Sequence, residues 1–576
     1  MALPKNGTTV AEPSLDWNVA KSMLAGLPGG GLNLAHEAVD RHVAEGRGDR
    51  LALTCLGRRY ERQTFTFAQL ADASSRAASV LIECGVKPGD TVAVLLGRTA
   101  DLYLAALGCW KAGAVFCPLF GAFGPGPLKS RLEFSRAKVL IATEPLYARK
   151  ISGVRGNLPD LTHVLLVGED GNPPAPHQGC GDFRALIQAA QPAQTVATTA
   201  QSPAFVHFTS GTTGTPKGAV HAHGSALSHL VTGKQVFELH ADDVYWCTAD
   251  PGWITNTAYA LVAPLVNGCA SIADEAEFDP RRWYGVLADE KVTVWYTTPT
   301  NIRMMMRYGA ALARTYRGNS LRLAASVGEP LNAEAVTWGD KALGAPFLDT
   351  WWQTETGAIA IANLPGRAKP GSMGLPLPGV EAAVVTRNLS RVEVVTDPET
   401  VGELALKADL PSLFTAYVGD KGRFESSFAD GWYLTGDLVR RDADGFFWFV
   451  GRSDDMIKSA GHTIGPFEIE STLMDHPAVG EIGVVGKPDL LLREVPVAFV
   501  SLNPGFEPGE ALRLELLHFA RQELGSAMAP REVVFVEFMP KTTTGKILRR
   551  ALKAKAVAEP DDEPLMAPCP GRFDDE

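Results

Sequence analysis

The sequence predicts an α/β protein with a large N-terminal portion of several subdomains and a small α+β C-terminal domain. Short β-rich runs alternate with helical patterns along most of the 576 residues, and this alternation is typical of mostly parallel sheets flanked by helices. The length exceeds that of one ordinary core, which indicates several subdomains. After the aromatic run at 446–450, the segment Gly451-Arg452-Ser453-Asp454-Asp455 separates this part from a new, smaller α+β pattern.

The expected elements follow one another in α/β order. The turn Lys87-Pro88-Gly89-Asp90 introduces the first clear strand. The pattern predicts strands at 91–96, 138–142, 163–167, 291–296 and 446–450, and helices at 102–112 and 301–308. No repeat of 20–50 residues is found, which excludes solenoids and propellers. We therefore expect an N-terminal domain at 1–453, a C-terminal domain at 454–556 and an acidic, disordered tail at 557–576.

Composition excludes several classes of protein. The net charge of −11 argues against nucleic acid as a partner. The N-terminus lacks an apolar signal region, and no apolar run reaches the length of about 18 residues that a membrane-spanning helix needs. The eight cysteines never form C-x-x-C, so neither a zinc ribbon nor a redox pair is predicted. We expect a soluble, cytoplasmic protein without membrane attachment.

A loop rich in glycine and threonine at 209–218 is the first candidate binding element. Its glycines allow a close backbone approach to an anion, its hydroxyls donate hydrogen bonds, and Lys217 supplies charge. Gly218 follows Lys217, so the loop does not have the Walker spacing. The sequence thus predicts a phosphate loop of another fold, formed by Thr209, Ser210, Gly211, Thr212, Thr213, Gly214 and Lys217.

Three further segments, at 349–357, 433–437 and 540–546, stand in a fixed order with this loop and with the segment 451–455. They read DTWWQTETG, YLTGD and PKTTTGK. Together they resemble the adenine-and-metal, ribose-binding and catalytic-lysine motifs of the adenylate-forming superfamily. The resemblance extends from about Trp17 to about Ala551 and implies a mobile C-terminal domain.

Within that superfamily, the sequence resembles the short-chain acyl-CoA synthetases, and among them the acetyl-CoA synthetases. The doubled Trp351-Trp352, the segment 249–255 and Gly328-Glu329-Pro330 carry this resemblance. It implies a ligase that activates a small carboxylate, with acetate expected, through an acyl-AMP to the acyl-CoA. ATP, Mg²⁺ and CoA are the implied cofactor and co-substrates, and AMP and pyrophosphate are the products.

The resemblance also implies roles for individual residues. Lys546 would bridge the carboxylate and the α-phosphate, and Asp454 would be the hinge about which the C-terminal domain swings between the two half-reactions. Asp437 and Arg452 would contact the ribose, and Glu355 would bind Mg²⁺. The adenine and α-phosphate would be framed by Gly328, Glu329, Pro330, Asp349, Thr350, Trp351, Trp352, Gln353 and Thr354.

The acyl pocket and the CoA site are placed by the same resemblance. The pocket would be formed by Ile254, Thr255, Val327 and Trp352, with the Trp352 indole as its floor. CoA would contact Thr255, Thr298, Ala460, Gly461 and Arg521. His476 matches a cation site of the family, whereas His221 and His223 are expected to be packing residues. Lys546 is also a candidate for control by a lysine acetyltransferase and a deacetylase.

Some features depart from the acetyl-CoA synthetases. Thr463 replaces an arginine that contacts phosphate, the segment 464–468 resembles medium-chain enzymes, and Arg149 and Lys150 are weak counterparts of a basic CoA-binding segment. A propionyl-CoA or other short- or medium-chain synthetase therefore remains an alternative, as does an adenylation enzyme that loads a carrier protein. Acetyl-type Trp352 argues against a luciferase, and Lys546, Glu355 and Asp437 argue against an inactive nucleotide sensor. The sequence leaves open whether the protein is a monomer or a homo-oligomer.

Overall fold

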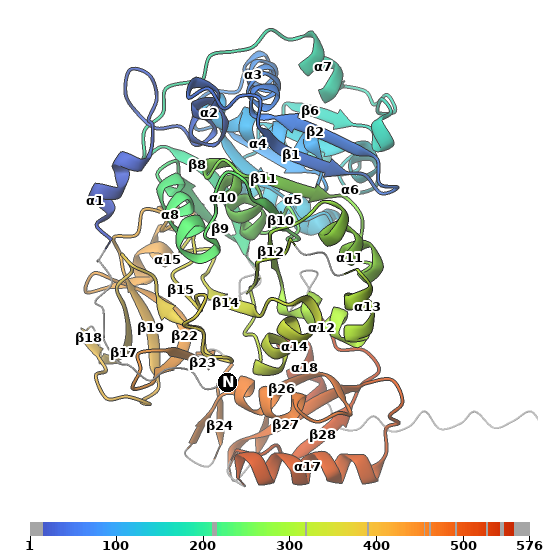
Figure 1. Ribbon diagram of the computed structural model, residues 1–576, viewed down its shortest axis with the longest axis vertical. Helices are drawn as coiled ribbons and strands as arrows, with labels where there is room; N and C mark the ends of the chain where they lie inside the picture. Colours follow the sequence, from blue (N-terminus) through green and yellow to red (C-terminus); the bar gives the residue numbers. More distant parts are fainter. Residues whose placement is uncertain are drawn as a thin grey trace, which may run out of the picture. The chain divides into compact units, whose positions relative to one another are not determined.

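The computed structural model describes residues 15–209, 216–316, 320–388, 391–453, 455–459, 462–489, 492–525, 528–541 and 547–557. The chain divides into two compact units: an N-terminal unit (1–400, 404–435 and 441–448) and a C-terminal unit (401–403, 436–440 and 449–576). The N-terminal unit contains large, mainly parallel sheets, and the C-terminal unit is a smaller α+β body (Figure 1). The predicted fold class is thus confirmed. The predicted boundary at Asp454 stays a prediction, because that residue lies outside the described ones.

One sheet of the N-terminal unit has a parallel centre and antiparallel edges. Its strands run in the order β16 (Leu375–Pro376), β15 (Ile361–Ala362), β14 (Phe347–Trp351), β13 (Leu323–Val327), β12 (Val294–Thr297), β10 (Val244–Cys247), β11 (Ala270–Asp274), β1 (Leu51–Leu56) and β2 (Arg62–Thr66). Both faces are covered: on β12, Val294 and Tyr296 belong to one hydrophobic core and Trp295 to another. Burial on both faces is what parallel sheets require.

A second sheet of the same unit contains the strand that leads into the predicted phosphate loop. Its order is β20 (Ala416–Tyr417), β9 (Lys217–Ala222), β8 (Pro203–Thr209), β4 (Val115–Pro118), β3 (Thr91–Leu95), β5 (Val139–Thr143), β6 (His163–Val167) and β7 (Cys180–Asp182). Strands β8 and β9 form a hairpin, in which Thr209 pairs with Lys217. Residues 210–215, which connect them, are not described.

Helices cover the two sheets of the N-terminal unit. The first long one, α3, begins with a capping box in which the Thr66 hydroxyl accepts from Gln69 N and the Gln69 side chain accepts from Thr66 N. It packs closely on α4, since a Cβ atom on Gly108 would lie 2.8 Å from that of Ala77. The helices are α1 (Trp17–Ala20), η1 (Lys21–Met23), η2 (His36–Asp40), α2 (Arg41–Ala44), α3 (Phe67–Glu83), α4 (Ala100–Lys111), α5 (Pro125–Ser135), α6 (Glu144–Lys150), η3 (Arg155–Asn157), η4 (Glu169–Gly171), α7 (Phe183–Ala189), α8 (Ser225–Phe237), α9 (Ile254–Asn256), η5 (Thr257–Val262), α10 (Ala263–Val266), α11 (Pro280–Asp289), α12 (Pro299–Arg307), α13 (Gly309–Thr315), α14 (Ala333–Leu343) and α15 (Lys421–Ser426).

A third, mainly antiparallel sheet follows along the chain. Its order is β18 (Arg391–Val394), β17 (Ala382–Asn388), β19 (Gly402–Lys407), β22 (Trp432–Arg441) and β21 (Phe428–Ala429), and β23 (Phe447–Arg452) pairs with β22. Within β22, residues 432–435 belong to the N-terminal unit and residues 436–440 to the C-terminal unit.

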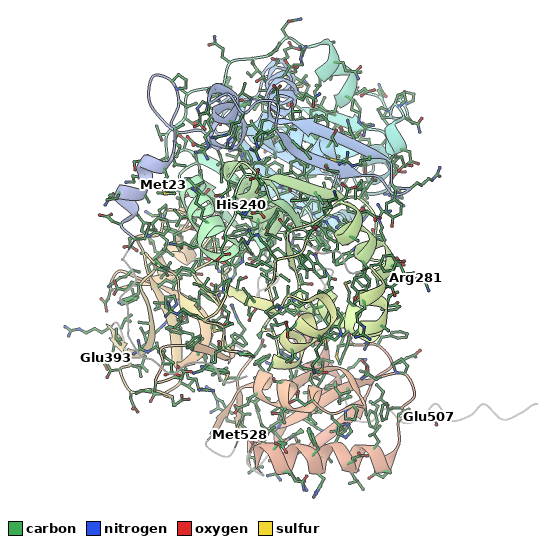
Figure 2. The ribbon with its side chains drawn as sticks, in the orientation of Figure 1. Met23, His240, Arg281, Glu393, Glu507 and Met528 are labelled. Atoms are coloured by element: carbon green, nitrogen blue, oxygen red, sulfur yellow. The ribbon has the colours of Figure 1, made fainter. Side chains whose placement is uncertain are left out.

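The C-terminal unit consists of helices and one mixed sheet. The sheet has the order β25 (His462–Ile464), β24 (Ile457–Ser459), β27 (Arg493–Leu502) and β26 (Val479–Asp489), with β28 (Glu532–Phe535) beside β27. Helices α16 (Pro466–Met474) and α17 (Glu510–Leu524) share a hydrophobic core with it, and α18 (Arg549–Val557) packs on β26. Charged side chains such as Arg281, Glu393 and Glu507 are exposed at the periphery of their units (Figure 2).

Most predicted elements are present at nearly the predicted positions. The strand at 163–167 is found with its predicted bounds, and the helix predicted at 102–112 is α4. The strand predicted at 291–296 begins three residues later, because Lys291 adopts a left-handed φ of 54° after α11. Among the described residues, no helix combines the length and apolar character needed to span a membrane.

Candidate active site

The carboxyl ends of four neighbouring parallel strands lie at one edge of the first sheet. Strands β10, β12, β13 and β14 are adjacent and parallel. Their ends lead into the segments 248–255, 298–300, 328–330 and 352–355, which contain ten of the site residues predicted in the N-terminal unit. Ligands of α/β proteins bind at such edges. The topology therefore brings together segments that are far apart in the sequence.

Asp349 is a buried carboxylate at this edge. It lies on β14, accepts a hydrogen bond from the Ser326 hydroxyl on β13 (2.7 Å), and accepts from the backbone N–H groups of Thr350 (3.1 Å) and Leu331 (3.4 Å). Burial raises the pKa of Asp349 to about 7, although these three hydrogen bonds oppose the shift. Asp349 thus connects β14 to the chain that follows the 328–330 segment.

Replacing Asp349 by asparagine is expected to flatten the dependence of stability on pH. The folded protein retains the proton of Asp349 up to a pKa of about 7, whereas the unfolded chain releases it near the ordinary value of 3.8. Stability should therefore fall as pH rises from about 4 to about 7, by on the order of 4 kcal/mol, since each pH unit between the two pKa values corresponds to about 1.4 kcal/mol.

Urea unfolding of the wild type and of Asp349→Asn, followed by tryptophan fluorescence from pH 5 to pH 8, measures this effect. The matched control is Asp340→Asn, at an exposed position on α14. Equal slopes in the wild type and Asp349→Asn would show that Asp349 is ionised throughout this range.

The loop at 328–330 is held in place by its backbone and by α12. Gly328 has a φ of 93°, which favours glycine, and a Cβ atom there would lie 3.4 Å from the Trp253 ring. The Glu329 carboxylate accepts from the Thr300 hydroxyl (2.7 Å) and from the Arg303 guanidinium. Pro330 is half-buried. The loop that the sequence assigned to the adenine is therefore a braced turn.

Trp352 is fixed by a chain of hydrogen bonds. Its indole N–H donates to the Tyr296 hydroxyl (3.1 Å). The Tyr296 hydroxyl lies 2.7 Å from that of Thr350, which in turn donates to the Ser326 carbonyl (2.7 Å). The indole also makes an edge-to-face contact with Tyr259, with ring centroids 5.1 Å apart. The Trp352 indole is therefore held in one orientation.

The other residues predicted for the acyl pocket are also buried. Ile254, Val327 and Trp352 belong to one hydrophobic core, and each is less than a tenth exposed. Thr255 is also buried, on α9 beside Ile254. Thr298, predicted to contact CoA, caps α12 by accepting from Asn301 N (3.3 Å). The structure thus places these residues in the interior of the N-terminal unit, and their role as an acyl pocket stays a prediction.

The hairpin of the predicted phosphate loop is connected to the same edge. Thr209 and Lys217 form the last pair of the hairpin before the loop and are half-buried, while Ser210, Gly211, Thr212, Thr213 and Gly214 lie outside the described residues. On β8, the His207 ring is 3.3 Å from the Gly252 carbonyl and 2.9 Å from the Thr257 hydroxyl. His207 therefore joins the strand that leads into the loop to the segment that carries Ile254.

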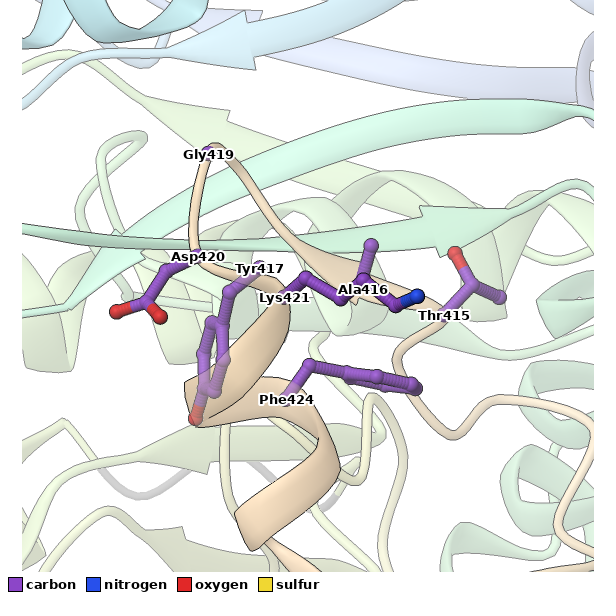
Figure 3. A pocket seen from close by; sticks show the side chains of 7 residues that line it. All are labelled: Thr415, Ala416, Tyr417, Gly419, Asp420, Lys421 and Phe424. Atoms are coloured by element: carbon purple, nitrogen blue, oxygen red, sulfur yellow. The ribbon is translucent and has the colours of Figure 1, made fainter.

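Glu355 and Gln353 are held by residues that follow later in the chain. The Tyr417 hydroxyl donates to the Glu355 carboxylate (2.7 Å), and burial together with the Glu355 charge raises the pKa of Tyr417. The Gln353 amide accepts from the Tyr433 hydroxyl (2.8 Å) and donates to the Thr435 carbonyl (3.0 Å). Thr354, between them, is half-buried. A pocket of about 400 Å³ is lined by Tyr417 together with Thr415, Ala416, Gly419, Asp420, Lys421 and Phe424 (Figure 3).

The predicted residues of the C-terminal unit are only partly described. The Arg452 guanidinium donates to the Asp437 carboxylate (2.7 Å), so the two predicted ribose contacts pair with each other. Arg521 is exposed on α17. Asp454, Ala460, Gly461 and Lys546 lie outside the described residues.

The histidines singled out in the sequence are largely buried. His221 stacks on Phe205, and its Nδ1 lies 2.9 Å from the Ser412 carbonyl, while His223 Nδ1 accepts from Leu34 N (3.0 Å). Burial lowers the pKa of His221 to about 4 and that of His223 to about 3. His476 accepts from Ala478 N (3.3 Å) and contacts Glu515. Among the described residues, no group of three or more His, Cys, Asp or Glu side chains is placed to hold a metal ion.

Several contacts at the site could not be found from the sequence. Tyr417 reaches Glu355 across 62 positions, and Arg303 reaches Glu329 across 26. Tyr417 is placed by the pairing of β20 with β9, which no local pattern indicates. Tyr433 was within the ribose motif, but its contact with Gln353 was not foreseen.

Comparisons with known proteins agree with this geometry. Residues 40–418 match the AMP-binding enzyme family, and residues 468–546 match the AMP-binding enzyme C-terminal domain. An acetyl-coenzyme A synthetase of Bacillus subtilis (strain 168) is 41% identical over 94% of this chain and 93% of its own length. Among solved structures, an acyl-CoA synthetase of Brucella canis is 34% identical, with a TM-score of 0.73 over 94% of this chain and 97% of the other.

An anthranilate CoA ligase solved in complex with anthranoyl-AMP is 28% identical, with a TM-score of 0.83 over 93% of this chain and 99% of the other. The agreement extends over both units, since the two family matches lie largely in different ones. The chain belongs to the AMP-binding enzyme family.

Proposed function

We propose that this protein is an AMP-forming acetyl-CoA synthetase. Acetate would attack the α-phosphate of ATP to give acetyl-AMP and pyrophosphate, and the CoA thiol would then displace AMP to give acetyl-CoA. The observation that supports this most is the carboxyl edge of the first sheet, where the 328–330 loop and buried residues predicted for the acyl pocket lie at the ends of neighbouring parallel strands, and where His207 connects strand β8 to the 252–257 segment. The name of the Bacillus relative, acetyl-coenzyme A synthetase, supports acetate as the acid.

In this proposal the first half-reaction depends on positioning and on neutralising charge. The hairpin residues Thr209 and Lys217, with 210–214 between them, would bind the phosphates. The 328–330 loop would frame the adenine, with Asp437 and Arg452 at the ribose. Lys546 would lie between the carboxylate and the α-phosphate, where negative charge increases in the transition state.

Glu355 offers the kind of ligand that Mg²⁺ requires. Carboxylate oxygens are hard donors suited to this ion, and Tyr417 occupies one oxygen of Glu355 while orienting the group. When bound with ATP, Mg²⁺ would offset the negative charge of the phosphates. The proposed role of His476 as a cation ligand has less support, because both of its ring nitrogens contact protein groups.

The second half-reaction would require the C-terminal domain to turn about Asp454. Lys546 would leave, and Ala460, Gly461, Thr255, Thr298 and Arg521 would contact CoA. A domain that moves in this way can exclude water from the labile acetyl-AMP.

Replacing Asp454 by proline is expected to retain acetyl-AMP formation and to abolish most thioester formation. Proline holds φ near −65°, so the backbone could not change conformation between the half-reactions. ATP–pyrophosphate exchange measures the first step, and acetyl-CoA production from supplied acetyl-AMP measures the second. Normal thioester formation in the variant would place the hinge elsewhere.

The proposed function is tested by measuring AMP release with ATP, CoA and a series of unbranched acids of one to eight carbons. Acetate should give the highest kcat/KM. A maximum at three or more carbons would favour the propionyl or medium-chain alternative. AMP release that requires a carrier protein instead of CoA would identify a carrier-loading enzyme.

A further inference from the structure

The two ends of the segment 542–546, which contains Lys546, meet on the C-terminal unit. Lys541 and Ile547 pair as an antiparallel bridge, and Leu548 N donates to the Pro540 carbonyl (2.8 Å). The Lys541 ammonium is bound to Glu481 on β26 (2.7 Å). The segment 542–546 therefore begins and ends at neighbouring positions. We call these two paired ends the base of the segment, and the position of the base limits how far Lys546 can extend.

Arg549 anchors the chain immediately after this base. Its guanidinium donates twice to the Glu470 carboxylate, at 2.6 Å and 2.9 Å, in a bidentate pair. Glu470 lies on α16 and also accepts from Val484 N on β26 (2.7 Å). The two side chains are only 22% and 10% exposed. Such a shielded, two-point bond fixes both distance and orientation.

The same guanidinium reaches the chain beside the predicted hinge. Arg549 Nε is 3.6 Å from the Asp455 carboxylate, and Lys553, one turn further along α18, is 3.9 Å from it. Asp455 is the residue after Asp454. Arg549, which is three residues after Lys546, therefore contacts two carboxylates. One is Asp455, next to the predicted hinge, and the other is Glu470 on α16.

We propose that Arg549 is a positioning residue for acetyl-AMP formation. Its bond to Glu470 fixes the position of the chain that follows Lys546. Its contact with Asp455 connects this chain to the residue after the predicted hinge, so that the two would move together. This inference rests on the proposed function. Since a misplacement of about 1 Å can cost about a hundredfold in rate, loss of the Glu470 pair should impair the step that uses Lys546 and not the step that follows its departure.

A purely structural role predicts a different result. If Arg549 only stabilised the C-terminal unit, its loss would lower both half-reactions by the same factor, because both need that unit folded. The ratio of the two half-reaction rates therefore separates positioning from stability.

The test compares Arg549→Gln, Glu470→Gln and their double variant in the full-length protein. The matched control is Arg550→Gln, which changes the exposed neighbouring arginine, and Lys546→Ala is measured alongside. Each protein is assayed by ATP–pyrophosphate exchange with acetate, by acetyl-CoA formation from supplied acetyl-AMP, and by its thermal midpoint.

We expect Arg549→Gln and Glu470→Gln each to lower pyrophosphate exchange by about ten- to a hundredfold, with thioester formation within about twofold of the wild type. The double variant should be no worse than either single variant, since both remove one interaction. If Arg549→Gln does not fold, Arg549→Lys, which keeps the charge without the bidentate geometry, takes its place.

Equal losses in both half-reactions, or exchange unchanged from that of Arg550→Gln, would overturn the inference. Full pyrophosphate exchange in Lys546→Ala would overturn the role proposed for Lys546, whereas the absence of acetate-dependent exchange in the wild type would overturn the proposed function itself.

Discussion

Replacing Lys546 by alanine is expected to lower acetyl-AMP formation by about 10²- to 10³-fold, which is the usual effect of removing one donor that stabilises a developing negative charge. Acetyl-CoA formation from supplied acetyl-AMP should be retained, because in the proposed mechanism the lysine segment would leave before the thiol attacks. Pyrophosphate exchange and the thioester assay report the two steps separately. The matched control is Lys555→Ala, at an exposed position on α18.

Equal loss of both steps would contradict the prediction that Lys546 acts only in acetyl-AMP formation. The same reasoning predicts that acetylation of Lys546 inactivates the first step, since the modification removes the charge of the ε-amine. An acetyltransferase and a deacetylase acting on this residue would then switch the enzyme off and on. Full activity of protein acetylated at Lys546 would exclude this form of control.

Replacing Trp352 by glycine is expected to move the preferred acid from acetate to longer chains. The indole is held by Tyr296 and Tyr259 and cannot turn aside, so in the wild type a longer acid would overlap with it. Without the indole, acids of four or more carbons should gain about tenfold to a hundredfold in kcat/KM relative to acetate, because pocket contacts of this size discriminate by such factors. Acetate should bind more weakly, since its methyl group would face a void.

AMP release across the acid series measures this shift. Trp352→Gly also removes a buried side chain, at a stability cost of about 3–5 kcal/mol, so Trp338→Gly serves as a control. Trp338 packs on the core of the opposite sheet face, which lacks the predicted pocket residues. A Trp352→Gly enzyme that still prefers acetate and rejects butyrate to octanoate would show that Trp352 is only a core residue.

The sequence by itself determined the fold class, because alternation of short apolar runs and helical patterns is a local property. The strand at 163–167 and helix α4 show this, since neither depends on distant partners. The sequence was also sufficient to identify the family. Each motif consists of contiguous residues, so its order and spacing can be compared directly; the motifs lie at 209–218, 349–357, 433–437 and 540–546.

The local pattern was less reliable where the backbone conformation mattered. The strand predicted from Lys291 begins only at Val294, because Lys291 has a left-handed φ that a hydrophobic run does not reveal. Likewise, the apolar character of Trp352 could not distinguish a pocket wall from a core residue. The hydrogen bond to Tyr296, 56 residues away, is what makes its indole rigid.

Only the tertiary structure decided how the site residues are supported. The raised pKa of Asp349 follows from its burial on β14 beside β13, and the residue type in a motif carries no information on burial. The Tyr417–Glu355 and Arg549–Glu470 pairs join residues 62 and 79 positions apart. Such pairs depend on which strands and helices become neighbours. The packing of the whole unit determines this, because each local segment contributes only a small part of the free energy of folding.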